Sequence, residues 1–301
     1  MIVEKTAQFT GHKDCVYALA KSYDSNLFLS AAGDGMVVQW NIDQPDQGEL
    51  IAKVPNSVYA IHLLEALGQV LVGQNFEGIH LIDIREKKEL KSLKLSDSYI
   101  FDIQHIDNKI FVACGNGEVI IVDLVNFTKI HAIKLSDKSA RTIALNPILK
   151  EFAVGYSDYK IRVFSLENFT LLNTIDGHTN SVFTVCYSPD YKYLVSGGRD
   201  AHLKIWNCWD HYELHTSIVA HMYAINHIDF SPNGLYMATA SMDKSVKLWS
   251  LDNFQLLKVI DKSRHAGHGT SVNKLLWLDN SRLLSCSDDR NISLWTVTRG
   301  N

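Results

Sequence analysis

Short runs of β-branched and aromatic residues, bounded by turn residues, recur along the whole chain. In the clearest stretch the runs cover Ser181 to Ser188, Tyr193 to Gly197 and His202 to Asn207, and a fourth follows around Leu214 to Ala220. Ser-Pro-Asp and Gly-Arg-Asp turns separate the first three. The runs are nearly continuous apolar stretches, which is typical of small sheets covered on both faces. No helical periodicity is sustained, so the pattern predicts an all-β chain built from units of four short strands.

This four-strand unit returns every 40 to 46 residues. In four of the units a tryptophan stands six residues after an aspartate, as Trp206 does after Asp200. A unit of this size cannot bury its apolar faces alone and must stack on similar neighbours. Seven units fill the chain and leave no room for a second domain. Their residues at the tryptophan position are Trp40, Ile82, Val122, Phe164, Trp206, Trp249 and Trp295.

Seven small sheets predict a closed ring, because radial repetition leaves only short, protected strand edges. The last unit ends soon after its third strand, Ile292 to Val297, whereas a strand-like segment, Ile2 to Phe9, precedes the first unit. We therefore expect residues 2–9 to be the outer strand of the seventh sheet and to close the ring. The predicted fold is a single seven-bladed β-propeller domain over residues 1–301. The expected blades are approximately residues 10–52, 53–94, 95–135, 136–176, 177–219, 220–262, and 263–301 together with 1–9.

Composition narrows the classes of function. The chain is 46% hydrophobic and 21% charged, and its net charge of -4 at pH 7 argues against a general nucleic-acid binder, which would be strongly basic. No apolar run reaches the roughly 18 residues of a membrane span, and the first residues lack the pattern of a signal peptide, so we expect a cytoplasmic protein. Five cysteines without C-x-x-C spacing indicate neither a disulfide framework nor a zinc site. We expect no metal, no cofactor, and a monomer.

Three units begin with a Gly-His pair and one with Ala220-His221; an aspartate follows about 22 residues later and a tryptophan six beyond it. This combination resembles the WD-repeat β-propeller family over the whole chain. In that family a histidine, a hydroxyl residue, the aspartate and the tryptophan form a hydrogen-bonded tetrad inside a blade. The resemblance implies four tetrads here: His12, Ser30, Asp34, Trp40; His178, Ser196, Asp200, Trp206; His221, Thr239, Asp243, Trp249; and His268, Ser285, Asp289, Trp295.

The tetrads have a structural and a catalytic interpretation. A buried indole N–H and an imidazole each need a hydrogen-bond partner, and the aspartate and the hydroxyl can supply them. Aspartate, histidine and serine also suggest a hydrolase triad. Four copies of one triad in a single chain, each with its histidine engaged on both sides, favour the structural interpretation. The chain has no Walker loop, G-x-S-x-G elbow, H-E-x-x-H or EF-hand sequence either, so we expect a protein that is not an enzyme.

The second, third and fourth units depart from the motif. Their tryptophan positions hold Ile82, Val122 and Phe164, and their histidine positions hold no histidine. We expect apolar packing to hold these three blades without a polar network. Outside the motif, we expect Trp209 to pack against an outer strand, with an exposed contact on the rim as the alternative. We expect the basic residues of the segment 258–268 to form a solvated loop, with a contact to an anion or a phosphorylated partner as the alternative.

In WD-repeat propellers the start of the innermost strand and the residue before the tetrad aspartate meet partners on the narrower face. The resemblance places a ring of residues there, five positions after each histidine: Tyr17, Tyr59, Phe101, Arg141, Phe183, Asn226 and Asn273. Tyr99 comes from a position two residues earlier, and Arg199 and Asp288 precede tetrad aspartates. Aromatic residues and arginine are enriched at interface hot spots.

These positions suggest a peptide- or protein-binding face with an aromatic, cationic half on blades two to five, suited to a segment with an acidic or aromatic side chain. The alternative is that the rings only close the top of the channel and pack on each other. A propeller enzyme that uses the central channel is a further alternative, although the residues placed at the mouth include one carboxylate, Asp288, and no histidine. A carbohydrate or small-ligand site that uses stacking on Tyr17 and Tyr59 is another. Fold alone does not choose between these functions.

Overall fold

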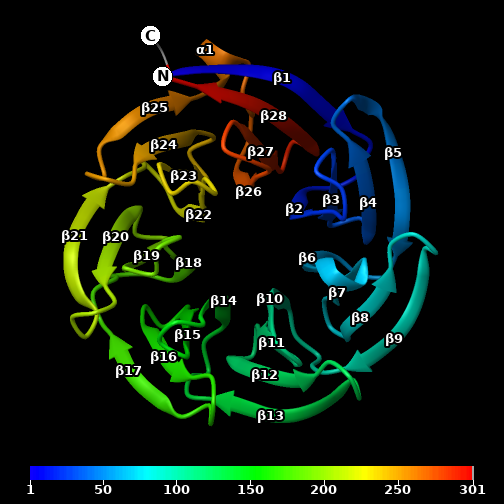
Figure 1. Cartoon of the computed structure of the whole chain (residues 1–301), viewed down its shortest axis with the longest axis vertical. Helices are drawn as coiled ribbons and strands as arrows, with labels where there is room; N and C mark the ends of the chain where they lie inside the picture. Colours follow the sequence, from blue (N-terminus) through cyan, green and yellow to red (C-terminus); the bar gives the residue numbers. More distant parts are fainter. Residues whose placement is uncertain (300–301) are drawn as a thin grey trace.

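Seven four-stranded antiparallel sheets form a closed ring in the computed structural model, which describes residues 1–299 (Figure 1). In six of the blades the strands follow each other in chain order from the channel outward, and in the seventh the first strand of the chain takes the outermost place; each strand pairs with the next. The prediction of an all-β, seven-bladed propeller is confirmed.

Blades one to four use consecutive strands. Blade one contains β2 (Val16–Lys21), β3 (Leu27–Ala32), β4 (Met36–Asn41) and β5 (Gln44–Lys53). Blade two contains β6 (Val58–Leu64), β7 (Gln69–Gln74), β8 (Gly78–Asp83) and β9 (Lys88–Lys94). Blade three contains β10 (Ile100–Ile106), β11 (Lys109–Cys114), β12 (Glu118–Asp123) and β13 (Thr128–Lys134). Blade four contains β14 (Ala140–Asn146), β15 (Glu151–Tyr156), β16 (Ile161–Ser165) and β17 (Leu171–Ile175).

Blades five to seven complete the ring. Blade five contains β18 (Val182–Tyr187), β19 (Tyr193–Gly198), β20 (His202–Asn207) and β21 (Glu213–Val219). Blade six contains β22 (Ile225–Phe230), β23 (Tyr236–Ser241), β24 (Val246–Ser250) and β25 (Leu256–Ile260). Blade seven contains β26 (Val272–Trp277), β27 (Arg282–Ser287), β28 (Asn291–Thr298) and, as its outer strand, β1 (Ile2–Thr10).

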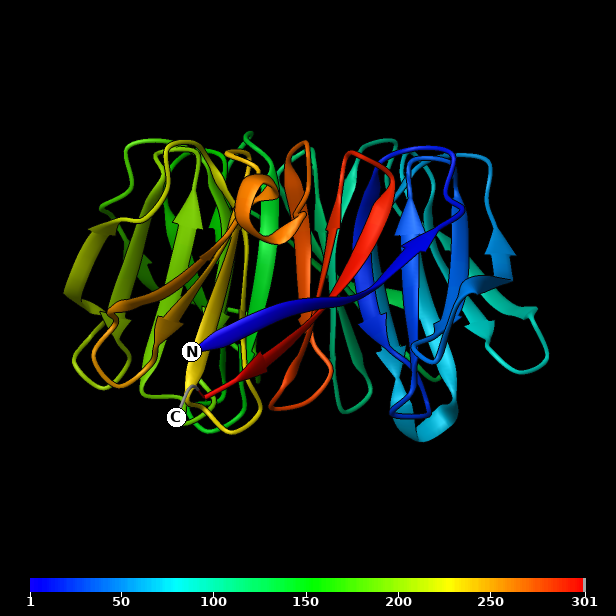
Figure 2. The ribbon, with the colours of Figure 1, turned by 90° about the horizontal axis from the view of Figure 1, so that it is seen from above.

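The two ends of the chain close the ring in blade seven. Strand β1 pairs with β28 in antiparallel register, from Ile2 opposite Thr298 to Thr10 opposite Asn291. Figure 2 shows the two strands side by side in the outer wall. The side chain of Phe9 is fully buried, and its ring centre lies 4.9 Å from that of Phe28 in the neighbouring blade. The predicted closure of the ring by residues 2–9 is confirmed.

The hydrophobic core lies between neighbouring blades rather than inside one of them. One cluster joins Leu29 and Val37 of blade one to Val58 and Val70 of blade two, and similar clusters fill the other gaps around the ring. Each sheet is therefore covered on both faces, which explains why its strands are nearly continuous apolar runs.

The ring has two faces, which differ in the connections they carry. In an antiparallel blade, the connection from each outer strand to the next inner strand and the turn between the second and third strands lie at the same edge. That edge carries the short helix α1 (Lys262–His265) and is called the upper face below; it is at the top of Figure 2. The lower face carries the other turns, including the 3-10 helix η1 (Glu65–Leu67).

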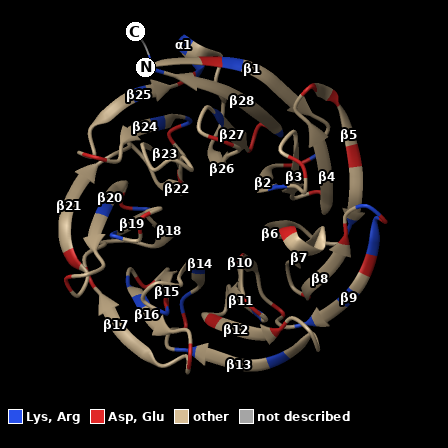
Figure 3. Cartoon of the chain, in the orientation of Figure 1, with Lys and Arg blue, Asp and Glu red and all other residues tan. Residues whose placement is uncertain are grey.

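Charged side chains are spread around the ring rather than gathered on one side (Figure 3). Within residues 1–299 no helix has the length and apolar character required to cross a membrane.

The prediction for Trp209 is wrong: this residue lies in the turn between β20 and β21 and is 61% exposed. Its position in a turn rather than in a strand leaves most of the side chain in solvent.

In four blades a hydrogen-bonded network joins the strands. In blade five, His178 Nδ1 lies 2.8 Å from a carboxylate oxygen of Asp200 and Nε2 lies 2.7 Å from Ser196 Oγ. Trp206 Nε1 donates to the same hydroxyl oxygen over 2.8 Å. The equivalent residues of blades one, six and seven make the same three contacts. Each tetrad histidine thus has both ring nitrogens engaged inside a sheet.

Blades two and four contain polar networks of a different kind. In blade four, the two terminal guanidinium nitrogens of Arg162 donate to the carboxylate of Asp158, over 3.1 and 2.7 Å, and Arg162 packs on the Tyr156 ring. In blade two, His80 contacts Gln74 over 3.0 Å and a glutamate over 2.7 Å. The expectation that apolar packing alone holds these blades is therefore wrong for both, because a third-strand side chain supplies the polar partner that the motif lacks.

Candidate functional site

A one-residue bulge interrupts each of the seven inner strands just after its first paired residue. In β10, Ile100 pairs with Cys114 and Asp102 pairs with Ala113, which leaves Phe101 as the extra residue. A bulge redirects its side chain and breaks the alternation of the strand. The extra residues of the seven strands are Tyr17, Tyr59, Phe101, Arg141, Phe183, Asn226 and Asn273.

The bulge residues line one cavity of about 440 Å³ at the upper end of the central channel, called the mouth pocket below. The structure thus brings together the seven residues that the sequence places on one ring, and adds Tyr99 from the connection before β10. Four further residues line the pocket: Asp102, Thr142, His227 and Lys274. Each directly follows a bulge residue, and the broken alternation turns two successive side chains toward the channel.

The mouth pocket therefore contains a histidine and a carboxylate that the sequence analysis missed, so its description of the mouth was incomplete. Both groups are engaged with the backbone of a neighbouring blade. Asp102 accepts a hydrogen bond from the N–H of Ile143 over 2.7 Å, and His227 Nδ1 accepts one from the N–H of Leu275 over 3.2 Å. These contacts tie one inner strand to the next.

Aromatic rings form a continuous cluster on one side of the pocket. The ring centres of Tyr17 and Tyr59 are 4.5 Å apart, and those of Tyr59 and Tyr99 are 5.8 Å apart in nearly parallel planes. Tyr99 also packs on Phe101 over 5.5 Å and on Phe76 over 4.7 Å. The rings pack on each other, as the alternative interpretation expects, and they also border an open cavity.

Arg141 lies between two phenylalanines of the pocket. Its guanidinium carbon is 3.9 Å from the ring centre of Phe101 and 4.7 Å from that of Phe183. Burial lowers the pKa of Arg141 to about 10, so the group stays charged at neutral pH. Cation–π attraction to the two rings offsets part of the cost of removing this charge from water.

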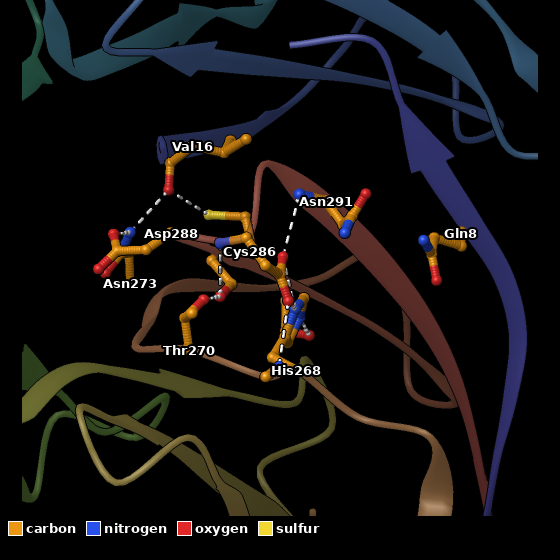
Figure 4. Close-up of polar contacts among 12 residues, drawn as sticks. Gln8, Val16, His268, Thr270, Asn273, Cys286, Asp288 and Asn291 are labelled. Atoms are coloured by element: carbon orange, nitrogen blue, oxygen red, sulfur yellow. Dashed lines mark hydrogen bonds and ion pairs between the residues drawn. The ribbon is translucent and has the colours of Figure 1, made fainter. Parts of the chain in front are cut away.

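Asn226 and Asn273 connect blades on the opposite side of the pocket. Asn226 Nδ2 donates to the carbonyl oxygen of Val272 over 2.8 Å. Asn273 Nδ2 donates to the carbonyl oxygen of Val16 over 3.0 Å and to the Asp288 carboxylate over 2.8 Å, as Figure 4 shows. Asp288 itself does not line the pocket. These polar groups link blades six, seven and one, so the mouth pocket has an aromatic side and a side of interblade hydrogen bonds.

The upper face also exposes apolar side chains that the sequence analysis did not select. On blade six, Met222, Tyr223 and Met242 are 81%, 61% and 51% exposed. A hydrogen bond of 3.0 Å from the N–H of Met242 to the carbonyl oxygen of Ala224 holds their two loops together. Arg199, on the equivalent loop of blade five, is exposed. Met222, Tyr223 and Met242 could have been found from the sequence by their position, because they lie next to the tetrad histidine and aspartate of the same blade.

Below the mouth pocket, a second cavity of about 540 Å³ occupies the lower channel. It contains His62, whose pKa burial lowers to about 4, and Asp229, whose pKa burial raises to about 6. Asp229 accepts a hydrogen bond from the N–H of Trp277 over 2.7 Å. Among the described residues, no group of three or more histidines, cysteines and carboxylates is arranged to hold a metal ion.

The family model described as "WD domain, G-beta repeat" matches residues 3–41, 169–207, 212–250 and 260–296. The chain belongs to the WD40 family. The matched segments contain the four tetrads, and the unmatched residues 42–168 contain blades two and three and the first three strands of blade four, which lack them. The resemblance stated from the sequence is confirmed.

Relatives and solved structures agree with this assignment. The chain is 27% identical to Actin-interacting protein 1 of Drosophila melanogaster over 305 residues, which is 95% of the chain and 46% of the relative. It is 32% identical to the probable cytosolic iron-sulfur protein assembly protein 1 of Aspergillus terreus over 56% of the chain and 37% of the relative. The chain therefore spans less than half the length of these relatives. The crystal structure of the WD40 β-propeller domain of Doa1 superposes with a TM-score of 0.87, covers 99% of the chain and 97% of that domain, and is 16% identical, which shows the shared fold.

Proposed function

We propose that this WD40 chain is a non-catalytic interaction scaffold that binds a peptide or protein segment on its upper face, around the mouth pocket. The observation that carries the proposal is the aromatic cluster that runs from Tyr17 to Phe101 and meets Arg141 at the pocket wall. Stacked rings and a stacked arginine present a large, rigid contact area that loses little conformational entropy on binding. Asn226, Asn273 and Asp288 frame this surface, and Arg199 extends it toward blade five.

The names of two relatives support a scaffold. One is named as an actin-interacting protein and the other as an assembly protein, and both names describe interaction with other proteins. The word cytosolic in the second name also supports a cytoplasmic location. We propose the same class of role for this chain, without its relatives' partners, because the aligned parts cover only 46% and 37% of these relatives.

A small-ligand site or an enzyme that uses the channel is the second candidate. The observation in its favour is the mouth pocket itself, which includes Asp102, His227 and Lys274. Against it, the oxygens of Asp102 and the Nδ1 of His227 are engaged by backbone N–H groups, so neither is free to act as a base. The scaffold explains more of the exposed aromatic surface.

Affinity purification with mass spectrometry tests the proposal. Alanine at Tyr59 or Phe101 removes part of the cluster and should abolish the capture of partners that wild-type protein enriches. Leu172→Ala, on the outer strand β17, is the matched control, since this side chain is 55% exposed and far from the pocket in the chain's topology. If both upper-face variants retain the same partners as wild type, the binding surface lies elsewhere on the ring.

A further inference from the structure

The guanidinium of Arg141 has donors without acceptors. In the described part of the chain, this group makes no hydrogen bond and no ion pair. It contacts the rings of Phe101 and Phe183. A guanidinium has five N–H donors, which ring faces do not satisfy in the plane of the group. The structure thus places a partly buried cation, without a counterion, in the wall of the mouth pocket.

A second cation shares the pocket. Lys274 follows the bulge of β26, and its side chain lines both the mouth pocket and the cavity below it. Over residues 1–299, its ammonium group makes no hydrogen bond and no ion pair. Lys274 was not predicted from the sequence, because only one position of each inner strand was expected to face the mouth.

The single carboxylate of the pocket compensates only one of these two positive charges. Asp102 accepts hydrogen bonds from the N–H groups of Ile103 and Ile143, over 2.9 and 2.7 Å, and from the amide of Gln104 over 3.1 Å. Its oxygens are therefore committed to the inner strands. The pocket has a net positive charge and one aromatic side, so charge-assisted hydrogen bonds to an entering anion would be strong there.

We propose that the mouth pocket is a carboxylate subsite: a glutamate or aspartate side chain of the bound segment enters it and accepts hydrogen bonds from Arg141 and Lys274. This inference rests on the proposed function and specifies the chemistry of the partner. A pocket of about 440 Å³ has room for one such side chain but not for a folded domain. The exposed rings of Tyr99 and Phe76 at the rim would then contact apolar residues beside the acidic one.

Three probes test the subsite by NMR titration of the whole protein. They are the blocked tripeptide acetyl-Phe-Glu-Phe-amide, the same tripeptide with glutamine, and acetate. We expect the glutamate peptide to bind wild type at least about tenfold more tightly than the glutamine peptide, and acetate to bind more weakly than both. In Arg141→Gln and Lys274→Gln this preference should fall below about twofold. Lys138→Gln removes an exposed lysine from the upper face and should keep it.

The following outcomes would contradict the proposed carboxylate subsite. Equal affinity for the two peptides, a preference that survives both substitutions, or no binding of either peptide below about 10 mM contradicts it. Acetate that binds as tightly as the glutamate peptide indicates a site for free small acids instead. If the two peptides bind equally and Tyr99→Ala weakens both, the upper face still binds peptides and the carboxylate subsite alone is wrong. Far-ultraviolet circular dichroism and thermal midpoints confirm that each variant folds.

Discussion

The guanidinium of Arg141 lies over the ring of Phe101, with 3.9 Å between the guanidinium carbon and the ring centre. The ring attracts the cation, while burial costs free energy because it removes the charge from water. These two effects have opposite signs, and the attraction offsets part of the desolvation cost. We therefore expect Arg141 to contribute little to the stability of the ring, in keeping with its proposed role in binding.

Replacing Arg141 with methionine tests this balance. We expect Arg141→Met to change the free energy of unfolding by less than about 1 kcal/mol, since the cation–π attraction and the desolvation cost disappear together. Chemical denaturation of wild type and variant measures the difference. A loss of more than about 2 kcal/mol would show that Arg141 holds the blades together.

The hydroxyl of Ser196 serves two buried partners in the tetrad of blade five. In Ser196→Ala, Trp206 Nε1 and His178 Nε2 lose their shared partner and stay buried. We expect a loss of about 2 to 4 kcal/mol in the free energy of unfolding. Ser217→Ala, at an exposed serine of the same blade, is the control and should change it by less than about 0.5 kcal/mol. If the two substitutions had equal effects, the tetrad would not stabilise the blade.

His62 makes stability depend on pH. Burial is the main cause that lowers its pKa to about 4, and the neighbouring His105 and Lys274 lower it further. The unfolded chain, with a pKa near 6.5, takes up the proton first, so the contribution of this histidine is complete above pH 6.5 and is lost as the pH falls toward 4.

Comparing variants isolates this contribution. Between pH 7.5 and 4.5, His62→Gln should lose about 2 kcal/mol less stability than wild type. The buried Asp229 has a raised pKa and changes stability in the opposite direction, but it is present in both proteins and cancels in the comparison. The exposed His211→Gln is the control and should follow wild type. If His62→Gln follows wild type as well, the histidine is not buried as described.

Ring closure depends on β1, and on Phe9 in particular. Removing residues 1–9 exposes the edge of β28 and leaves a void beside Phe28, so we expect the thermal midpoint to fall by at least about 10 °C. Phe9→Ala alone should cost about 3 to 5 kcal/mol, whereas the half-exposed Ile2→Ala should cost less than about 1 kcal/mol. A truncated protein that melts within a degree or two of full length would contradict closure by this strand.

The repeat period predicted the blades and the closing strand because both follow from local patterns. Three tryptophan positions that hold no tryptophan could still be placed, since the strand pattern continues through them. The partner of Asp158 was not predictable in this way. Arg162 lies four residues later on a third strand, and its guanidinium reaches the carboxylate only because the turn brings the two together.

The candidate site, too, could be predicted only in part from the sequence. The resemblance to the WD-repeat family identified the bulge residues, such as Arg141, but not the residue after each bulge, because a strand is expected to alternate its side chains. The bulge breaks that rule, so Lys274 and His227 also face the channel. Trp209 was misplaced for a related reason: its position in a turn, rather than its apolar character, decides its exposure.

Site-specific photocrosslinking tests the central claim, that the upper face is the binding surface. A photoreactive phenylalanine analogue replaces Tyr99 on the upper face, Ile148 on the lower face or Leu172 on the outer strand; these side chains are 42%, 61% and 55% exposed. The account predicts that partner adducts form from position 99, that Arg141→Gln reduces them, and that positions 148 and 172 give none. Adducts from position 148 or 172, with none from 99, would contradict it.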